Sequence, residues 1–240
     1  MNYKEEIVRL IAQMSMGTGA LALIGGTVVV VGFLTMAAGA LIAVQGYNQL
    51  AGIGVEALTG FVSAYINVRV IAPVNAGIAL AATIGAGATA QMGAMRISEE
   101  IDALEVMGIQ PVTFLAATRL LAAWMVLPFM YLAAIGVGFI ASYIAVVEQI
   151  GDTSSGGYLL IFWMFQNPPD LIFSVIKGMS MATAIVLVGC YYGYTAGGGP
   201  VGVGTATAKS MVLNIVLVHI IGMMGTLVFW GANPRAPIGG

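Results

Sequence analysis

Long runs of apolar residues without a single charge recur along the chain. They cover residues 10–55, 70–95, 120–147, 178–208 and 210–234. A charge at the centre of a bilayer is costly, and a spanning helix needs about 20 mainly apolar residues, so such runs indicate membrane spans. The pattern predicts an all-α membrane protein with five spanning helices, at residues 20–44, 73–95, 112–147, 171–195 and 211–232.

Glycine, proline and amide residues set the predicted boundaries. The first run is long enough for two spans, but residues 17–19 and 45–49 interrupt it, so one span is predicted there. Proline fits the first turn of a helix because its missing N–H would be unpaired there anyway. Pro73, Pro111 and Pro168 therefore mark the expected starts of the second, third and fourth spans.

The segments outside the spans also carry patterns. Charged and apolar residues alternate over residues 1–16, which predicts an amphipathic helix in the membrane interface, with a frayed chain end as the alternative. Glycine-rich residues 151–157 and 197–204 predict flexible turns. The second of these does not match a phosphate-binding loop, because such a loop needs glycine directly before lysine and Ala208 precedes Lys209.

The composition agrees with the membrane class. Of the 240 residues, 60% are hydrophobic and 8% are charged, and the mean hydropathy is +0.99. So few charges cannot coat a soluble domain, which on average has about 25% charged residues. With eight lysines and arginines and a net charge of −2, the chain has no basic surface for nucleic acid. We expect a single domain over residues 1–240.

Few residues suggest chemistry within the membrane. No acidic residue falls in the middle of a predicted span, which disfavours a transporter driven by protons or sodium. His219 and Cys190 are the only residues of their types, so the sequence predicts no metal site, and it identifies no catalytic residue. Energy for any uphill transport is expected from another subunit.

Small residues form two ridges along the second span. The first ridge is Gly77, Ala81, Gly85, Thr89 and Gly93, and the second is Ala82, Ala86, Ala90 and Ala94. Residues with almost no side chain let helices approach closely in lipid. The ridges predict close packing, either within the chain or at a subunit interface.

The segment 96–111, RISEEIDALEVMGIQP, is unusually acidic. It contains four of the ten acidic residues of the chain: Glu99, Glu100, Asp102 and Glu105. Ser98 is a suitable N-cap, and Gly108 followed by Pro111 is a stop signal. These features predict a short helix over residues 97–108, between the second and third spans.

One face of this short helix is expected to be apolar. Ile97, Ile101 and Leu104 recur at helical spacing. The helix is either a solvated loop helix or a lever on which a peripheral partner acts.

This segment and its flanks carry a family resemblance. Residues 90–109, AQMGAMRISEEIDALEVMGI, followed by Pro111 and by RLLA at 119–122, closely resemble the MlaE/YrbE family of permeases. These are membrane subunits of ABC transporters that work on lipids with MCE-domain proteins. Residues 68–73 (VRVIAP) and 196–204 (AGGGPVGVG) look like the B-type permease of actinobacterial, mycobacterial-type Mce systems. Val70 and Gln91 depart from the pattern, since many members have acidic residues there.

The resemblance implies a permease rather than an enzyme, with no cofactor of its own. ATP and magnesium would be bound by a cytoplasmic ATPase, which would dock on the coupling helix between the second and third spans. The residues implied in docking are Ser98, Glu99, Glu100, Ile101, Asp102, Leu104, Glu105 and Met107.

The resemblance also implies further partners and a direction. An A-type permease would complete a heterodimer, and MCE proteins would lie on the outer side. The lipids of related systems are fatty or mycolic acids, sterols or phospholipids, moved by import. We expect a plasma-membrane protein with its N-terminus in the cytoplasm and its C-terminus outside, since slightly more basic residues fall in the inner segments than in the outer ones.

The outer end of the first span combines an aromatic ring with amides. We expect Gln45, Tyr47 and Asn48 to line the mouth of the lipid pathway, with a simple interfacial anchor as the alternative. Two other functions stay open: a scaffold subunit, and a membrane-embedded lipid-modifying enzyme. The second would have to use Arg69 with Glu56, or Lys177 with Asp170.

Overall fold

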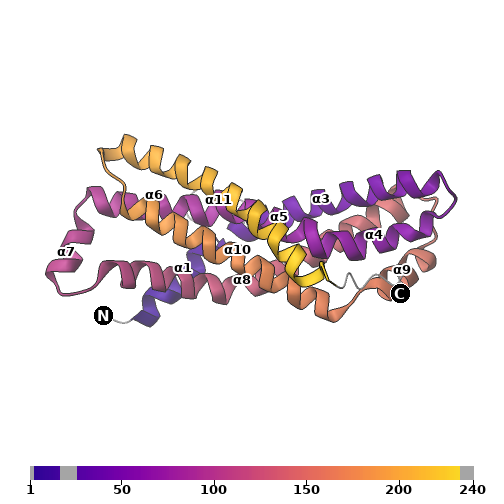
Figure 1. Cartoon of the computed structure of the whole chain (residues 1–240), viewed down its shortest axis with the longest axis horizontal. Helices are drawn as coiled ribbons and strands as arrows, with labels where there is room; N and C mark the ends of the chain where they lie inside the picture. The colour runs from indigo at the N-terminus through magenta and orange to yellow at the C-terminus, as the bar shows by residue number, and fades with distance from the viewer. Residues whose placement is uncertain (1–2, 17–25, 233–240) are drawn as a thin grey trace. The chain divides into compact units, whose positions relative to one another are not determined.

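The computed structural model describes residues 3–16 and 26–232, and within these ranges all regular structure is helical. Five helical segments of this part of the chain are long and apolar enough to cross a membrane (Figure 1). They are Gly26–Ala51, Glu56–Ile97, Pro111–Ile150, Pro168–Tyr194 and Gly199–Trp230. The prediction of an all-α membrane protein with five spans is therefore confirmed.

The first two helices are α1 (Tyr3–Met16) and α3 (Gly26–Ala51). Residues 17–25, where the first span was predicted to begin, lie outside the described part of the chain. The prediction that residues 45–49 interrupt the helix is wrong, because α3 continues through them. Amide side chains cost a helix well under 1 kcal/mol each, and Gln45 and Asn48 are exposed, so nothing forces the helix to stop there.

The second span begins well before Pro73, which is also contrary to prediction. A short turn, Glu56–Leu58, leads into α4 (Thr59–Ile66), α5 (Ala72–Leu80) and α6 (Ala86–Ile97), joined by two π-helical segments, Asn67–Ile71 and Ala81–Gly85. Proline inside a helix removes a backbone donor and clashes with the preceding turn. Here the wider π-helical turn lies directly before Pro73 and relieves that clash.

The third span begins at Pro111, as predicted. It comprises α8 (Pro111–Tyr143), which continues past Pro128, and a π-helical end, Ile144–Ile150. The flexible turn predicted at 151–157 is shorter, because the helix α9 (Ser155–Phe165) begins within it. The Ser154 hydroxyl caps α9 by accepting a hydrogen bond from the Gly157 N–H at 3.2 Å, which is a typical N-cap. The glycine-rich composition of residues 151–157 favours a turn and gives no sign of this helix start.

The last two spans are α10 (Pro168–Tyr194) and α11 (Gly199–Trp230). The predicted turn at 197–204 is wrong for most of its length, since α11 begins at Gly199 rather than near residue 211. Glycine is tolerated in membrane helices more readily than in soluble ones. Only the start of the segment turns, at Gly198 and Gly199, whose φ angles are +83° and +72°.

The chain divides into two compact units, and each of the five long segments contributes residues to both. The first unit comprises residues 1–29, 77–130 and 179–220, and the second comprises residues 30–76, 131–178 and 221–240. In the second unit an apolar cluster joins α3, α4, the end of the third span and α9 through Ala43, Ala64, Val146, Tyr158 and Phe162. In the same unit the backbones of α3 and α8 approach closely, since a Cβ added to Gly39 would lie 2.6 Å from the Gly138 carbonyl oxygen, and the Ser142 hydroxyl donates to the Gly39 carbonyl at 2.9 Å.

Candidate functional site

The acidic segment forms a short helix, α7 (Glu100–Val106), between α6 and α8 of the first unit (Figure 1). Glu99, with φ of 62°, makes the sharp turn from α6 into α7. The prediction that Ser98 caps this helix is wrong. The Ser98 hydroxyl instead donates to the Ala94 carbonyl at 3.0 Å and so belongs to the end of α6.

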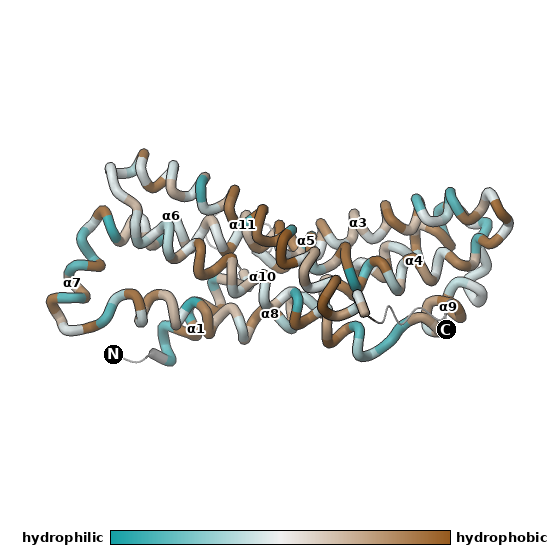
Figure 2. Tube along the Cα trace, in the orientation of Figure 1, coloured by the Kyte–Doolittle hydropathy of each residue, from teal (hydrophilic) through white to brown (hydrophobic). Residues whose placement is uncertain are grey.

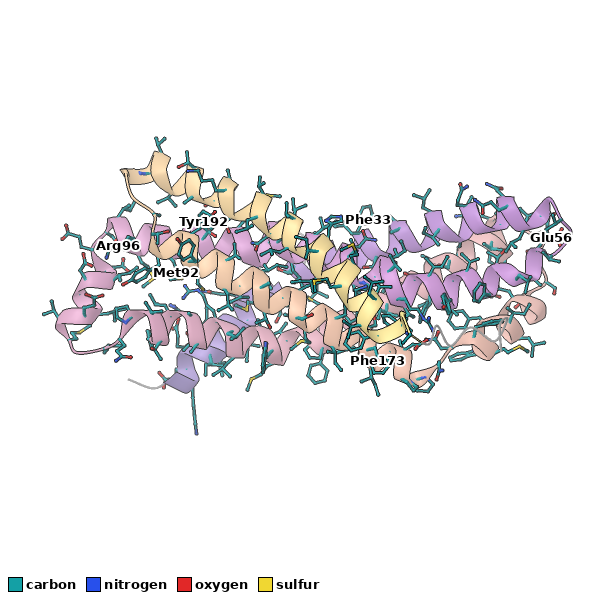
Figure 3. The ribbon with its side chains drawn as sticks, viewed as in Figure 1. Phe33, Glu56, Met92, Arg96, Phe173 and Tyr192 are labelled. Atoms are coloured by element: carbon teal, nitrogen blue, oxygen red, sulfur yellow. The ribbon has the colours of Figure 1, made fainter. Side chains whose placement is uncertain are left out.

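Three of the four acidic side chains of the segment have partners within the chain, and one of these contacts is the Ser98 hydroxyl, which donates to Glu100 at 3.0 Å. Arg96, at the end of α6 (Figure 3), forms an ion pair with Asp102 at 2.5 Å. The Tyr194 hydroxyl donates to Glu105 at 3.3 Å. The contacts of Asp102 and Glu105 fasten α7 to α6 and α10. Glu99 and Glu100, which are exposed, lie at the start of α7 and take no part in that fastening.

The apolar residues of α7 face two ways. Ile101 and Leu104 are buried, as their predicted face requires, whereas Ile97 is exposed and does not share that face. Val106 is 89% exposed, and Met107 is also exposed. Figure 2 shows the mixture of hydrophilic and hydrophobic positions along α7. We call Glu99, Glu100, Val106 and Met107 the α7 surface.

The first small-residue ridge packs against α10 and α11 of the first unit. A Cβ atom added to Gly85 would lie 2.8 Å from the Asn214 side chain and 2.9 Å from that of Ile185. A Cβ atom added to Gly77 would lie 2.8 Å from the Val218 side chain, and one added to Gly93 would lie 2.8 Å from that of Val203.

The polar and apolar members of this ridge are buried as well. The Thr89 hydroxyl lies 3.1 Å from the Gly189 carbonyl and 3.0 Å from the Ser210 hydroxyl, and Ala81 is fully buried. The contacts therefore place this ridge inside the chain. The second ridge differs, because Ala82, Ala90 and Ala94 are exposed.

The second unit contains a buried group of charged side chains from α10 and from the π-helical turn between α4 and α5. Arg69 is 3% exposed, Asp170 5% and Lys177 1%. The Arg69 guanidinium donates to one carboxylate oxygen of Asp170, at 3.1 Å from Nε and 2.5 Å from Nη2. Trp230 of α11 donates its indole N–H to the other carboxylate oxygen at 2.8 Å.

Aromatic rings and hydroxyl groups complete this group. The Arg69 guanidinium lies 3.6 Å from the centre of the Tyr65 ring, a cation–π arrangement. Lys177 donates to the Arg69 carbonyl at 2.8 Å and to the Thr226 hydroxyl at 2.7 Å. We call Arg69, Asp170, Lys177 and Trp230 the buried charged cluster. Phe173 (Figure 3) stacks beside it on Phe229, with ring centres 4.9 Å apart.

The pair that the structure forms differs from the pairs suggested by the sequence. The sequence suggested Arg69 with Glu56 and Lys177 with Asp170, whereas the structure pairs Arg69 with Asp170. The partners are 101 positions apart, so no local pattern indicates the pair. The residue types themselves are a signal, because ionisable residues within membrane spans are rare and expensive and are usually functional.

The residues expected at the mouth of a lipid pathway lie at the end of α3. Gln45 and Asn48 are exposed. Tyr47 is half-buried against the apolar cluster of the second unit, and its hydroxyl donates to Asp152 at 2.8 Å. Tyr47 thus fastens α3 to the loop before α9, a contact that suits an anchor as well as a pathway residue.

Five long apolar helices within the described residues, with a short acidic helix between the second and third of them, define a multi-pass membrane protein. The profile described as Permease MlaE matches residues 16–228. The chain belongs to the MlaE family of ABC transporter permeases.

Relatives come from bacteria and from plastids. The chain is 30% identical over 201 residues to a probable ABC transporter permease protein of Rickettsia prowazekii, covering 84% of this chain and 77% of that protein. It is 28% identical over 191 residues to the chloroplastic protein TRIGALACTOSYLDIACYLGLYCEROL 1 of Arabidopsis thaliana, covering 79% and 54%. A probable ABC transporter permease protein of Synechocystis is 26% identical over 169 residues, covering 70% and 64%.

The family assigns the chain its role in general terms. It is a permease subunit and not itself an enzyme, and permeases of this class imply a partner ATPase. Within the described residues no group of three His, Cys, Asp or Glu side chains could hold a metal ion.

Proposed function

We propose that the chain is the membrane subunit of an ABC transporter that moves lipids across the cell envelope. The observation that carries this proposal is the buried charged cluster, set among long apolar helices of an MlaE-family permease. A lipid needs apolar surface for its tails and a few polar groups for its head. The name of the Arabidopsis relative, after a galactolipid, supports a lipid substrate.

The coupling role falls to the α7 surface. It is tied to α6 and α10 by Arg96 and Tyr194, so a force on α7 is transmitted directly to two spanning helices. Exposed apolar Val106 and acidic Glu99 and Glu100 offer a mixed surface of the kind that protein interfaces use. The partner that docks here is the ATPase.

The further partners follow from the same assignment. A second permease, of the A type, pairs with this chain, and the exposed alanines of the second ridge are a surface on which helices can approach closely. MCE-domain proteins receive or deliver lipid on the outer side. The segments at 68–73 and 196–204 support membership of the B-type permeases of actinobacterial Mce systems, which import fatty or mycolic acids, sterols or phospholipids.

The proposed topology rests on the number of spans. Because the described residues contain five spans, an odd number, we propose that the two chain ends lie on opposite sides of the plasma membrane. With the N-terminus inside, α7 faces the cytoplasm, where the ATPase is, and the loop that contains Asp152 faces outward. Gln45, Tyr47 and Asn48 then lie at the outer interface, where we propose that they border the lipid pathway.

Purification of the tagged chain from its native membrane tests the proposal. We expect an ATPase, a second permease and MCE-domain proteins to co-purify, and lipid extraction followed by mass spectrometry to identify an enriched lipid class. Recovery of the chain without any ATPase would contradict the proposal. Chemical conversion of a lipid by the isolated chain would instead support the alternative of a lipid-modifying enzyme.

A further inference from the structure

A small pocket in the first unit is independent of the proposed lipid pathway. It lies among α1, the start of α3, α6 and α8, and its volume is about 80 Å³. Ligand pockets for whole drug-sized molecules have about 300–1,000 Å³, and one water molecule takes up about 30 Å³ of liquid. The pocket therefore has room for a small head group but not for an entire lipid.

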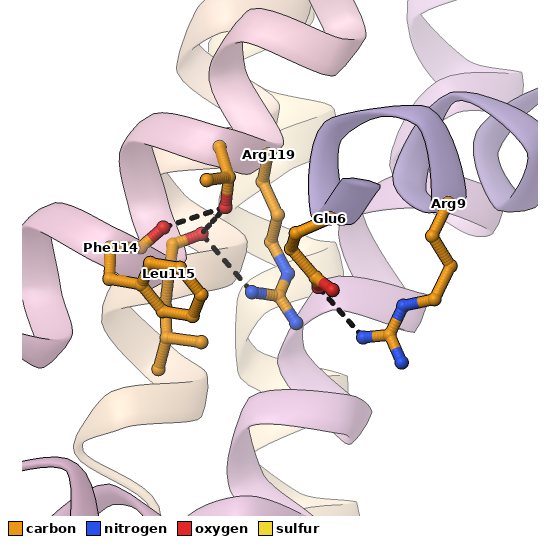
Figure 4. Close-up of polar contacts among 6 residues, drawn as sticks. Glu6, Arg9, Phe114, Leu115 and Arg119 are labelled. Atoms are coloured by element: carbon orange, nitrogen blue, oxygen red, sulfur yellow. Dashed lines mark hydrogen bonds and ion pairs between the residues drawn. The ribbon is translucent and has the colours of Figure 1, made fainter. Parts of the chain in front are cut away.

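One buried cation dominates the lining of this pocket. Arg119 of α8 is 4% exposed, and its Nη1 donates to the Leu115 carbonyl of its own helix at 3.1 Å (Figure 4). A guanidinium has five N–H donors, and this bond uses one of them. A buried charge is stable only when it is compensated, so the surroundings of Arg119 decide what the pocket can hold.

The charges facing Arg119 come from α1. Glu6 lies beside the guanidinium (Figure 4), but its carboxylate also forms an ion pair with Arg9 at 2.7 Å. The carboxylate of Glu6 is thus already paired with Arg9, and one positive charge, that of Arg119, is left over. The neighbouring Lys4 and Glu5 add one charge of each sign and do not change this sum.

The remaining lining is neutral and of two kinds. Polar side chains that can donate or accept hydrogen bonds are Gln13, Thr27, Thr83 and Gln91. Apolar side chains are Leu10, Met14, Ile84 and Ala88. A single excess cation with neutral donors and an apolar wall suits an anionic group attached to a hydrocarbon chain.

The depth of the pocket along its helices agrees with this ligand. Gln91 is six residues before the end of α6, and Arg119 is eight residues after the start of α8. At 1.5 Å per residue these positions lie about 9 and 12 Å from the helix ends that α7 joins. That distance is close to the boundary between lipid head groups and acyl chains, where the amphipathic helix predicted for residues 1–16 is also expected to lie.

We infer that this pocket binds the anionic head group, a carboxylate or a phosphate, of a lipid in the leaflet on the α7 side. The lipid holds α1 against α6 and α8 by neutralising Arg119. The site is separate from the buried charged cluster, because all of its residues belong to the first unit. Failure of this inference would leave the proposed transport function untouched.

The test measures lipid binding to the purified full-length chain in a neutral detergent by native mass spectrometry. The probes are oleate, dioleoylphosphatidate and dioleoylphosphatidylcholine, under alkaline conditions that ionise the carboxylate. We expect the first or the second probe to bind at least about tenfold more tightly than the zwitterionic lipid, and their order tells which anion the pocket prefers. Equal binding of all three probes would overturn the inference.

Two variants localise the binding. Arg119→Gln removes the cation, and Gly87→Leu fills the pocket, since a Cβ at Gly87 meets nothing within 4 Å and the variant should fold. Each should lower the affinity for the anionic probe about tenfold. Gly136→Leu is the matched control, another open helical glycine outside the pocket, and it should bind like the wild type. Unchanged binding in Gly87→Leu, or equal loss in Gly136→Leu, would contradict the assignment.

A third variant separates a ligand site from a purely structural ion pair. If Arg119 served only to hold α1 through Glu6, then Glu6→Gln would loosen the helix and would not favour any lipid. If the pocket binds an anion, Glu6 competes with it, and Glu6→Gln should raise the affinity for the anionic probe. Weaker anion binding in Glu6→Gln would overturn the inference.

Discussion

Two side chains of α10 supply hydrogen bonds to the carbonyls that precede Pro73. Because proline has no N–H, the carbonyls of Val68 and Arg69 lose the backbone donor that residue 73 would otherwise provide to one of them. The Ser174 hydroxyl donates to the Val68 carbonyl, and Lys177 donates to the Arg69 carbonyl. The two donors are three residues apart and share one face of α10. A proline inside a membrane span is thereby matched by polar groups on the neighbouring helix.

This compensation can be measured as a coupling between Pro73 and Lys177. Lys177→Met removes a donor from a buried carbonyl and should destabilise the protein by about 1–3 kcal/mol. Pro73→Ala provides a backbone N–H, so the double variant should lose less than the sum of the single variants. Thermal unfolding in detergent of the four proteins measures the coupling. Strict additivity would show that the two residues act independently.

The Arg69–Asp170 ion pair gives a second prediction at this scale. Asp170→Asn leaves a buried guanidinium without its counter-charge, and removal of one partner of such a pair costs about 3–5 kcal/mol. Asp102→Asn is the matched control, because it breaks an exposed ion pair worth at most about 1 kcal/mol. We expect a much larger loss of thermal stability for Asp170→Asn. Similar losses for both variants would contradict the description of the cluster as a compensated buried charge.

The proposed coupling to an ATPase depends on the helix α7. The double reversal Glu99→Lys/Glu100→Lys changes the exposed carboxylates and spares the Arg96–Asp102 pair, so α7 itself should remain in place. We expect it to weaken co-purification of the ATPase several-fold, since exposed ion pairs contribute up to about 1 kcal/mol each. Glu148→Lys, at an exposed position near the end of the third span, is the control.

The outcome also distinguishes two kinds of docking. If the reversal leaves ATPase binding intact while Val106→Ser/Met107→Ser abolishes it, docking is apolar and the acidic residues are not its determinants. If neither variant changes the amount of ATPase recovered, the α7 surface is not the docking site.

The first ridge of small residues predicts how the second span packs. Gly85→Leu would force a side chain against Asn214 and Ile185, and overpacking of this kind costs about 1–3 kcal/mol or prevents folding. Gly136→Leu adds the same side chain where a Cβ meets nothing within 4 Å. We expect a lower yield and an earlier thermal transition for Gly85→Leu alone, measured by size-exclusion chromatography and thermal unfolding. Equal behaviour of both variants would contradict the packing described.

At the scale of the whole molecule, the apolar runs were sufficient to predict the class and the five spans. Placing a charge in lipid costs so much free energy that the absence of charges identifies each spanning segment without reference to the other segments. The position of α7 was equally readable, because acidic residues, Gly108 and Pro111 follow one another within a few turns.

Features that depend on contacts between distant segments could not be predicted. Pro73 has the local pattern of a helix start, because the sequence around it indicates neither the π-helical turn before it nor the hydrogen-bond donors on α10. Ser98 belongs to the end of α6 and not to α7, because α6 extends to Ile97, two residues past its predicted end at 95, and the left-handed Glu99 follows. The Arg69–Asp170 pair and the Arg119 pocket each join residues from several helices, so the sequence named the residues but not their partners.

The central claim is that the chain is the lipid permease of an ABC transporter, and ATP-driven lipid transfer tests it most directly. The complex purified through the tagged chain is reconstituted into liposomes with a fluorescent lipid of the class found enriched on it, and transfer to or from the MCE-domain proteins is followed. We expect transfer that requires ATP and the ATPase subunit and is reduced by Glu99→Lys/Glu100→Lys but not by Glu148→Lys. Lipid transfer at the same rate without ATP, or none in a complex that hydrolyses ATP, would contradict the account.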